Sequence, residues 1–233
     1  MRLPAFRRAL TLALLATIGL STAACEYRRD GATRVTVIGD PPTIVDPASG
    51  PLTISESVLL SNVAQGLVRF DAHGQIEAGL AERWNVSDDG LSYIFRLASV
   101  EWPGGGKVTA QQVARLLRRQ MGARSSNPIR DTLGAVREIV PMTDRVIEIR
   151  LSEPRPNLLQ ILARPELAVV RDGQGTGPFQ LARQERNERG WLRLVRTVTD
   201  LEEEESRREE VLLGAAPAPT SVQQLLRGDT DLV

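Results

Sequence analysis

Few side chains in this 233-residue sequence could take part in catalysis. His73 is the only histidine and Cys25 is the only cysteine. A serine or cysteine nucleophile needs a base that is itself held by a third group, and the single histidine lies in the turn-forming residues 71–74 without such a partner. A zinc site needs several Cys or His ligands at set spacings. We therefore expect a protein that is not an enzyme and that uses neither a metal nor a cofactor.

Two other patterns could be taken for ion or phosphate sites. Asp88 with Asp89 and Asp229 with Asp231 lack the regular oxygen spacing of a calcium-binding loop, and roles in turns and caps account for them. Residues 104–107, Gly-Gly-Gly-Lys, lack the separated glycines and the Lys-Ser/Thr ending of a phosphate-binding loop. Neither pattern predicts a site.

The charges balance, with 29 basic and 29 acidic side chains, and 42% of the residues are apolar. A chain of this size can bury a core and hold one large domain or two small ones. Proteins that bind nucleic acid show a clustered basic face, and a balanced composition gives no reason to expect one. We expect no nucleic-acid partner.

The N-terminal residues have the layout of an export signal. In residues 1–24, three arginines precede a short apolar run and a group of small residues, which predicts a secretory signal peptide too short to span a membrane stably. Cys25 follows Ser-Thr-Ala-Ala, and this arrangement resembles a bacterial lipobox, whose cysteine is acylated. The alternative is ordinary cleavage that leaves a free thiol, a liability in an oxidising compartment. We expect a lipid anchor at Cys25, a polar tether over residues 25–33, and a location in the periplasm or cell envelope.

The middle of the chain gives the clearest local signals. Residues 91–97 alternate apolar and polar side chains, as a half-buried strand does. Thr109 with Gln112, and earlier Thr53 with Glu56, have the spacing of a capping box at a helix start. The apolar face of the later helix holds Val113, Leu116, Leu117 and Met121. The apolar face of the earlier one holds Leu60, Val63, Ala64 and Leu67, and Gly66 is its expected end.

Further elements are expected on both sides of this region. We expect a last helix capped by Thr220 with Gln223 and ended by Gly228, and a short helix over residues 156–162. The charged residues 200–210 are expected to form a solvated loop. The expected strands cover residues 34–39, 67–70, 79–86, 136–140, 146–151, 167–170 and 191–195, with a hairpin turn at 141–144 and a further strand beginning at 231.

Residues 66–119 also follow a specific order of sequence blocks, GLVRFD..G.I..GLAERW.VSDDGLSYIFRL....W..G..VTA..V...L.R. This order resembles the N-terminal signature of the extracytoplasmic substrate-binding proteins of peptide ABC transporters, the dipeptide- and oligopeptide-binding class of family 5. Residues 175–179 resemble the family's GTGPY block, and residues 225–232 resemble its L..GE.DL block. The resemblance runs from about Val35 to the last residue, although members of the family are usually more than twice as long.

The resemblance implies an α/β fold with a mixed β-sheet and flanking helices, as in a type II periplasmic-binding-protein lobe. Residues 34–233 would form the N-terminal lobe, incomplete relative to the family. The implied function is capture of peptides or similar small solutes by closure of two lobes and delivery to an ABC permease and its ATPase. Relatives bind peptides, nickel complexes, sugars or opines, so the ligand class stays open. The alternative is a shortened lobe that acts as a non-transport sensor or scaffold at the membrane.

Two stretches match places where the family lines its ligand cleft. Residues 40–47 resemble the family's tLDP segment, with valine at position 45 in place of leucine, and the cleft-side positions correspond to Pro42, Thr43 and Ile44. A rigid proline-rich connector is the alternative. Asn127 and Pro128 lie where the family has a cleft-side loop, and a solvated turn explains them equally well. The second wall of the cleft is expected beyond Val233, so this chain alone is expected to bind peptides no more tightly than millimolar.

Overall fold

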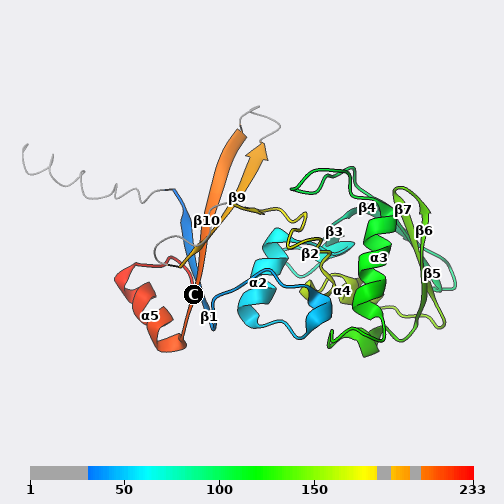
Figure 1. Ribbon diagram of the computed structural model, residues 1–233, viewed down its shortest axis with the longest axis horizontal. Coiled ribbons are helices and arrows are strands. Elements are labelled where there is room, and N and C mark those ends of the chain that lie inside the picture. The colour runs from blue at the N-terminus through cyan, green and yellow to red at the C-terminus, as the bar shows by residue number, and fades with distance from the viewer. Residues whose placement is uncertain (1–30, 183–189, 200–205) are drawn as a thin grey trace, which may run out of the picture. The chain divides into compact units, whose positions relative to one another are not determined.

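The computed structural model describes residues 31–182, 190–199 and 206–233 (Figure 1). The predicted signal peptide over residues 1–24, Cys25 and most of the tether lie outside these residues. The chain divides into Met1–Ala32 and a unit, Thr33–Val233, that holds every helix and strand given below. None of the helices in the described ranges combines the length and the apolar composition needed to cross a bilayer.

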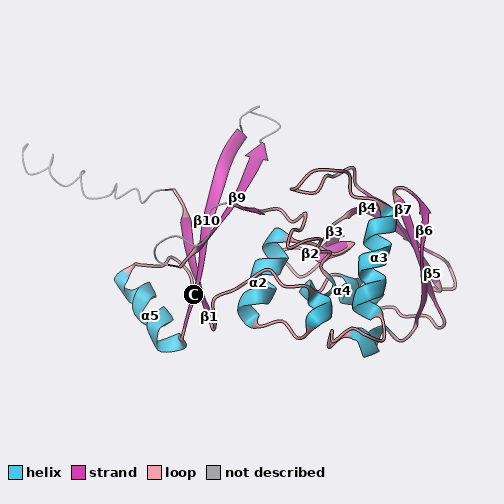
Figure 2. Cartoon of the chain, viewed as in Figure 1, coloured by secondary structure: helices cyan, strands magenta, loops and turns pink. Residues whose placement is uncertain are grey.

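One sheet joins residues from the two ends of this unit (Figure 2). Its order is β1-β10-β9-β8, with bounds β1 Thr33–Ile38, β10 Ser206–Ala216, β9 Leu192–Thr199 and β8 Gln180–Leu181. The sheet is mixed, because β1 runs parallel to β10 while the other pairs are antiparallel. On the other side of β1, Val35 forms a single parallel bridge with Leu232. The strand expected to begin at residue 231 is thus present as one bridge.

A second, antiparallel sheet has the order β4-β5-β7-β6. Its bounds are β4 Ala81–Val86, β5 Ser92–Leu97, β7 Val146–Leu151 and β6 Val136–Thr143, and α3, Ala110–Met121, packs against it. The alternation read in residues 91–97 is confirmed, because Tyr93, Phe95 and Leu97 are buried between the sheet and α3. The remaining short elements are β2 Val68–Phe70, β3 Ile76–Ala78, α4 Leu158–Leu162 and the 3-10 turns Pro47–Ser49, Arg130–Leu133 and Pro165–Leu167.

The capping box of α3 forms as predicted. The Thr109 hydroxyl accepts from Gln112 N at 3.3 Å, and Gln112 Oε1 accepts from Thr109 N at 3.2 Å. The same Gln112 oxygen accepts from the indole nitrogen of Trp102 at 3.0 Å. Arg171 stacks on the Trp102 ring at 4.5 Å. This tryptophan is buried in the main core.

Helix α2, Ile54–Val63, begins at the predicted box of Thr53 and Glu56 but ends earlier than expected. Its C-cap is Ala64, so the prediction that Gly66 ends the helix is wrong. Gly66 is instead a close-approach position, because a Cβ there would lie 2.5 Å from the carbonyl oxygen of Leu162. The last carbonyls of α2 are satisfied by a distant segment, which no local cap signal reports.

The N-terminal turn of α2 holds two hydroxyl groups, an exposed one that caps the helix and a buried one. Thr53 caps the helix, whereas the Oγ of the buried Ser55 has no hydrogen-bond partner among the described residues. We expect Thr53→Ala to lower the free energy of unfolding by about 1 kcal/mol. We expect Ser55→Ala to leave it unchanged or raise it, because an unpaired buried hydroxyl is removed. Urea unfolding of both variants measures this, and an equal loss in the two would contradict it.

Two further elements differ from those expected. Residues 167–170 are buried but form no strand, because Val169 N donates to the loop carbonyl of Gln65 at 3.0 Å and joins no ladder. Helix α5, Ala218–Arg227, begins at Pro217 without a side-chain cap, so the predicted box of Thr220 and Gln223 is wrong. A Pro at the first turn started the helix before that box. The prediction that Gly228 ends α5 is confirmed by its φ of 70°.

Two antiparallel strand pairs, β6 with β7 and β9 with β10, also extend further than expected. Strand β6 continues through Pro141, which pairs with Ile147, so the turn is shorter than residues 141–144. The charged run over residues 200–210 falls partly outside the described residues, but Ser206 to Glu210 belong to β10 and not to a loop. They pair with β9, where arginine and glutamate side chains alternate across the strands, as in Arg196 with Glu209 at 2.6 Å. Cross-strand ion pairs of this kind stabilise strand pairing. They explain why a run of charged residues forms a strand here and not the expected loop.

Candidate binding groove

The Gly-Thr-Gly-Pro-Phe segment, residues 175–179, crosses the C-terminal end of α2. Gly177 N donates to Val63 O and Phe179 N donates to Asn62 O, each at 3.0 Å. These bonds satisfy carbonyls that the end of a helix leaves unpaired. The approach is close, because a Cβ on Gly177 would lie 2.4 Å from the Asn62 carbonyl oxygen. The two glycines therefore let one backbone lie directly on another, and this contact fixes where Phe179 emerges.

Phe179 is held between an apolar cluster and a guanidinium group. It packs with Leu59, Val63 and Leu192 between α2 and the mixed sheet. The Arg196 guanidinium lies 4.8 Å from the ring centre. Glu209 binds that guanidinium, and the hydrogen bond from Arg196 holds the pKa of the Glu209 carboxyl below its ordinary value. The Glu209 carboxylate is therefore charged at neutral pH, and its bond to Arg196 keeps that guanidinium over the ring.

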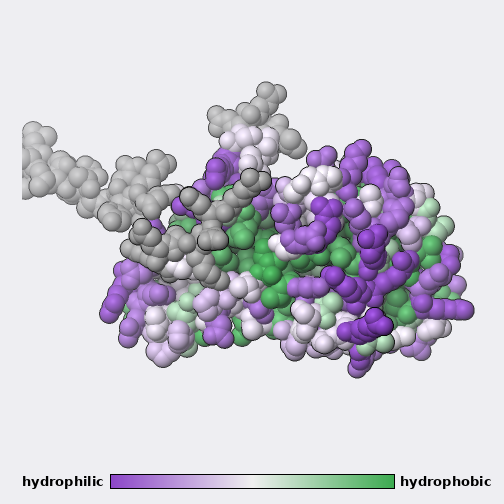
Figure 3. Space-filling model, in the orientation of Figure 1, coloured by the Kyte–Doolittle hydropathy of each residue, from purple (hydrophilic) through white to green (hydrophobic). Residues whose placement is uncertain are grey.

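Two adjoining cavities of about 340 and 560 Å³ lie beside Phe179 and share Ile44, Gly173 and Leu181. We call them together the groove. The groove is lined by residues from α2, from the segment after β1 and from the mixed sheet. The larger apolar side chains that line the groove are Ile44, Leu59, Val63, Phe179, Leu181 and Leu192. Figure 3 shows apolar surface over α2, the helix that contributes two of them.

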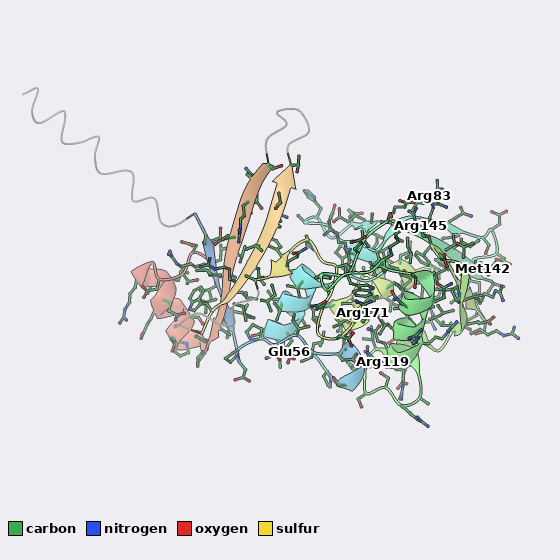
Figure 4. All side chains as sticks on the ribbon, turned by 45° about the horizontal axis from the view of Figure 1, so that its top comes forward. Glu56, Arg83, Arg119, Met142, Arg145 and Arg171 are labelled. Atoms are coloured by element: carbon green, nitrogen blue, oxygen red, sulfur yellow. The ribbon has the colours of Figure 1, made fainter. Side chains whose placement is uncertain are left out.

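A tight turn borders the groove on one side. Arg171 and Gln174 exchange both backbone hydrogen bonds, at 2.8 and 2.9 Å. Between them Asp172 and Gly173 have φ values of 53° and 71°, which is the left-handed pair of a type I′ hairpin turn, where Asp-Gly is favoured. Gln174 also closes on the loop at Gly104, where a Cβ would lie 2.8 Å from the Gln174 side-chain oxygen. Figure 4 labels Arg171, at the start of this turn.

The structure brings together the three predicted site residues that follow β1. Pro42, Thr43 and Ile44 all line the larger cavity, and Ile44 lines both. Thr43 is exposed and Ile44 is half-buried. The backbone N–H and C=O groups of these two residues have no hydrogen-bond partner among the described residues. The groove thus combines an apolar wall with backbone groups that have no partner in the described part of the chain.

The other two predicted residues lie elsewhere. The buried Asn127 side chain donates to Glu166 O at 2.6 Å and accepts from Ile129 N at 3.1 Å, so it holds its own loop in place. Pro128 is exposed and lines neither cavity. A contact between a ligand and these two residues stays a prediction.

Several groove residues carry no local signal in the sequence. Leu181 reaches the groove because β8 pairs with β9, placing Leu181 opposite Leu194. Leu59 and Leu192 were expected only as parts of a helix and a strand. Phe179 was visible only as part of the glycine motif that resembles a family block, and it was not predicted as a site residue. Within the described ranges no group of three or more His, Cys, Asp or Glu side chains is placed to hold a metal ion.

Comparisons with known proteins agree on one family. The model of the bacterial extracellular solute-binding proteins, family 5 (middle region), matches residues 75–233. The glutathione-binding protein GsiB of Salmonella paratyphi A is 30% identical over 190 residues, which cover 72% of this chain and 35% of GsiB. The chain spans about a third of the length of the curated relatives it matches.

Solved structures of periplasmic binding proteins share the fold. Listeria monocytogenes OppA bound to peptide matches with a TM-score of 0.70 and 16% identity, over 86% of this chain and 45% of OppA. DppA of Helicobacter pylori in complex with the peptide STSA matches with a TM-score of 0.66 and 20% identity, over 85% of this chain and 45% of DppA. The expected α/β fold of the type II periplasmic binding proteins is thereby confirmed for the part of the lobe that this chain covers.

Proposed function

The chain belongs to the family 5 bacterial extracellular solute-binding proteins, and on that premise we propose that it captures a peptide or a similar small solute for an ABC importer. The observation that carries the proposal is the groove, where unpaired backbone of Thr43 and Ile44 lies beside an apolar wall. OppA and DppA, which share the fold, were solved with peptides, and GsiB is named for glutathione. Each of these relatives is a binding protein, which supports capture without chemical conversion.

Binding would begin on the backbone. The amide groups of an extended ligand would pair with the free N–H and C=O groups of Thr43 and Ile44. Each such bond, exchanged with water, contributes only about 0.5–1.5 kcal/mol. A few of them do not offset an association cost of about 4 kcal/mol or more. Tight capture therefore needs a second wall that closes over the groove and excludes water.

The titration of isotope-labelled protein with a small peptide tests this site. We expect the backbone amide signals of Thr43, Ile44 and Leu181 to shift progressively as the peptide reaches millimolar concentration. The amide of Arg115, on the exposed face of α3, serves as an internal control and should stay in place. A peptide that shifts signals elsewhere, or none, would show that the groove is not its site.

We further propose that residues 1–24 direct export, that Cys25 is acylated, and that residues 25–33 tether the lobe to a membrane. Acylation follows from a lone cysteine directly after a signal-like segment, and two or more acyl chains hold a protein at a membrane stably. In cells fed an alkyne fatty acid, the wild type and Tyr27→Ala should be labelled and Cys25→Ser should not. Equal labelling of all three would disprove the anchor.

Delivery to a permease is the part of the proposal that separates transport from a sensor or scaffold role. A gene pair for a permease and an ATPase beside this gene would support delivery. A binding-competent protein whose deletion leaves uptake of its ligand unchanged would favour the sensor.

A further inference from the structure

From the groove's chemistry we propose which ligands it selects: peptides that place an uncharged aliphatic or aromatic side chain against Ile44, Leu181 and Leu192. The inference rests on the proposed function and deepens it by naming the ligand class. It concerns the specificity of this particular lining.

The lining of the groove carries no charge among the described residues. Every described residue that borders either cavity has a neutral side chain, and the polar ones are Thr43, Gln174 and Gln180. An acidic or basic ligand group seated here would lose water without gaining a partner, which is unfavourable. An apolar group would gain contact with the wall instead.

Two arginines beside the lining residues of the groove are occupied by other contacts. Arg171 stacks on Trp102 and its guanidinium also approaches the Gly105 carbonyl at 3.4 Å. Arg196 stacks on Phe179 and pairs with Glu209, which neutralises it. Neither guanidinium belongs to a residue that lines the groove. A ligand carboxylate in the groove would therefore meet no free positive charge from these two.

The lining residues of the groove differ in exposure, which leaves apolar surface for a ligand side chain to cover. Leu59 is fully buried and forms part of the core, whereas Leu181 is 38% exposed. Ile44 is half-buried. An apolar side chain of a ligand placed between Leu181 and Ile44 would cover both residues. It would also extend the apolar cluster that contains Phe179 and Leu192.

The unpaired backbone identifies the occupant as a peptide and not a purely apolar molecule. Thr43 and Ile44 offer backbone N–H and C=O groups beside the apolar wall. In an extended peptide, successive side chains point to opposite faces. A peptide paired with this backbone would direct every second side chain to one face, and hence one of them toward Leu181.

Three blocked tripeptides that differ only in the middle residue, Ala-Leu-Ala, Ala-Asp-Ala and Ala-Lys-Ala, test the selection. Titration of the purified protein is followed by the amide signals of Thr43 and Ile44. We expect the leucine peptide to bind about tenfold more tightly than either charged peptide, because one buried aliphatic side chain supplies at least the free energy of a tenfold change. Leu181→Asp should remove that preference and favour the lysine peptide.

Met142→Asp is the matched control. Met142 is 54% exposed on a strand, and it lies apart from Arg171 and the turn that borders the groove (Figure 4). It should keep the wild-type order of affinities, and so shows that an exposed carboxylate by itself does not change selection. Because both positions are exposed, both variants should fold, which circular dichroism checks.

The outcomes separate this inference from the proposed function. Equal affinity for the three peptides, with shifts at Thr43 and Ile44, would overturn the selection and leave the binding site standing. Failure of every peptide to shift those two signals would overturn the proposed function itself. An unchanged preference in Leu181→Asp would show that the apolar side chain sits elsewhere, and would also overturn the inference.

Discussion

We expect Gly177→Ala to lower the free energy of unfolding by about 3 kcal/mol, at the upper end of the usual cost of overpacking. A Cβ at this position would lie 2.4 Å from Asn62 O and 2.6 Å from Ala64 N. Both are backbone atoms at the end of α2, so no side chain can swing away to make room. Either the segment over residues 175–179 lifts off the helix, or α2 loses its last turn. Each alternative breaks the bonds from Gly177 and Phe179 to α2.

Gly50→Ala is the control for this substitution. Gly50 has extended backbone and no atom within 4 Å of a built Cβ. Its replacement should leave stability unchanged or raise it slightly, because alanine restricts the unfolded chain. Urea unfolding followed by circular dichroism measures both variants. Similar midpoints for Gly177→Ala and Gly50→Ala would contradict the close approach.

The second large effect is expected for Leu117→Asp, with a loss of about 4 kcal/mol or more, since a core contact is lost and a carboxylate enters without a partner. Leu117 is 0% exposed and packs in the core between α3 and the antiparallel sheet. Leu116, which the helical pattern also assigns to the apolar face, is only half-buried. Leu116→Asp should therefore cost clearly less, because its carboxylate can reach water.

Arg115→Asp is the matched exposed position on the same helix. It should change stability by about 0.5 kcal/mol or less. Gln111 is a poorer control, because its side chain donates to Asp144, and a new carboxylate there would meet an existing one. Thermal melts of the three α3 aspartate variants should rank Arg115, Leu116 and Leu117 in order of increasing loss. Any other order would show that the helix faces the sheet differently.

Features encoded within a few residues were predictable from the sequence. The two capping boxes at Thr53 and Thr109 formed as predicted, because the hydroxyl and the side-chain carboxylate or amide oxygen three residues later each accept from the other residue's backbone N–H. The alternation in residues 91–97 correctly predicted which side chains are buried, since a one-residue slip would expose all of them. Of the site, Pro42, Thr43 and Ile44 were found through a family motif; all three line the groove, and their contact with a ligand stays a prediction.

Features that depend on distant partners were not predictable in the same way. Residues 167–170 are as buried as a strand, but their neighbours are the side chain of Gln120 and the loop at Gln65, and no periodicity reports that. The end of α2 was misplaced because its cap comes from Gly177, far along the chain. The apolar wall of the groove needs the β8–β9 pairing to bring Leu181 and Leu192 to Ile44.

The mixed sheet also sets the order in which the molecule can be assembled. Arg34 N, in the first strand, donates to the Asp231 carboxylate across 197 residues, and β1 takes its ladder from β10. Contacts between such distant residues form slowly, because a long loop must close, at a cost in chain entropy, before the contacts can stabilise it. The antiparallel sheet and α3 are formed by one continuous stretch of the chain, so their contacts need no such long loop to close. During synthesis β1 is made first and has no strand partner until β10 has been made. The groove takes Leu192 from this sheet, so it is among the last parts of the protein to become able to bind a ligand.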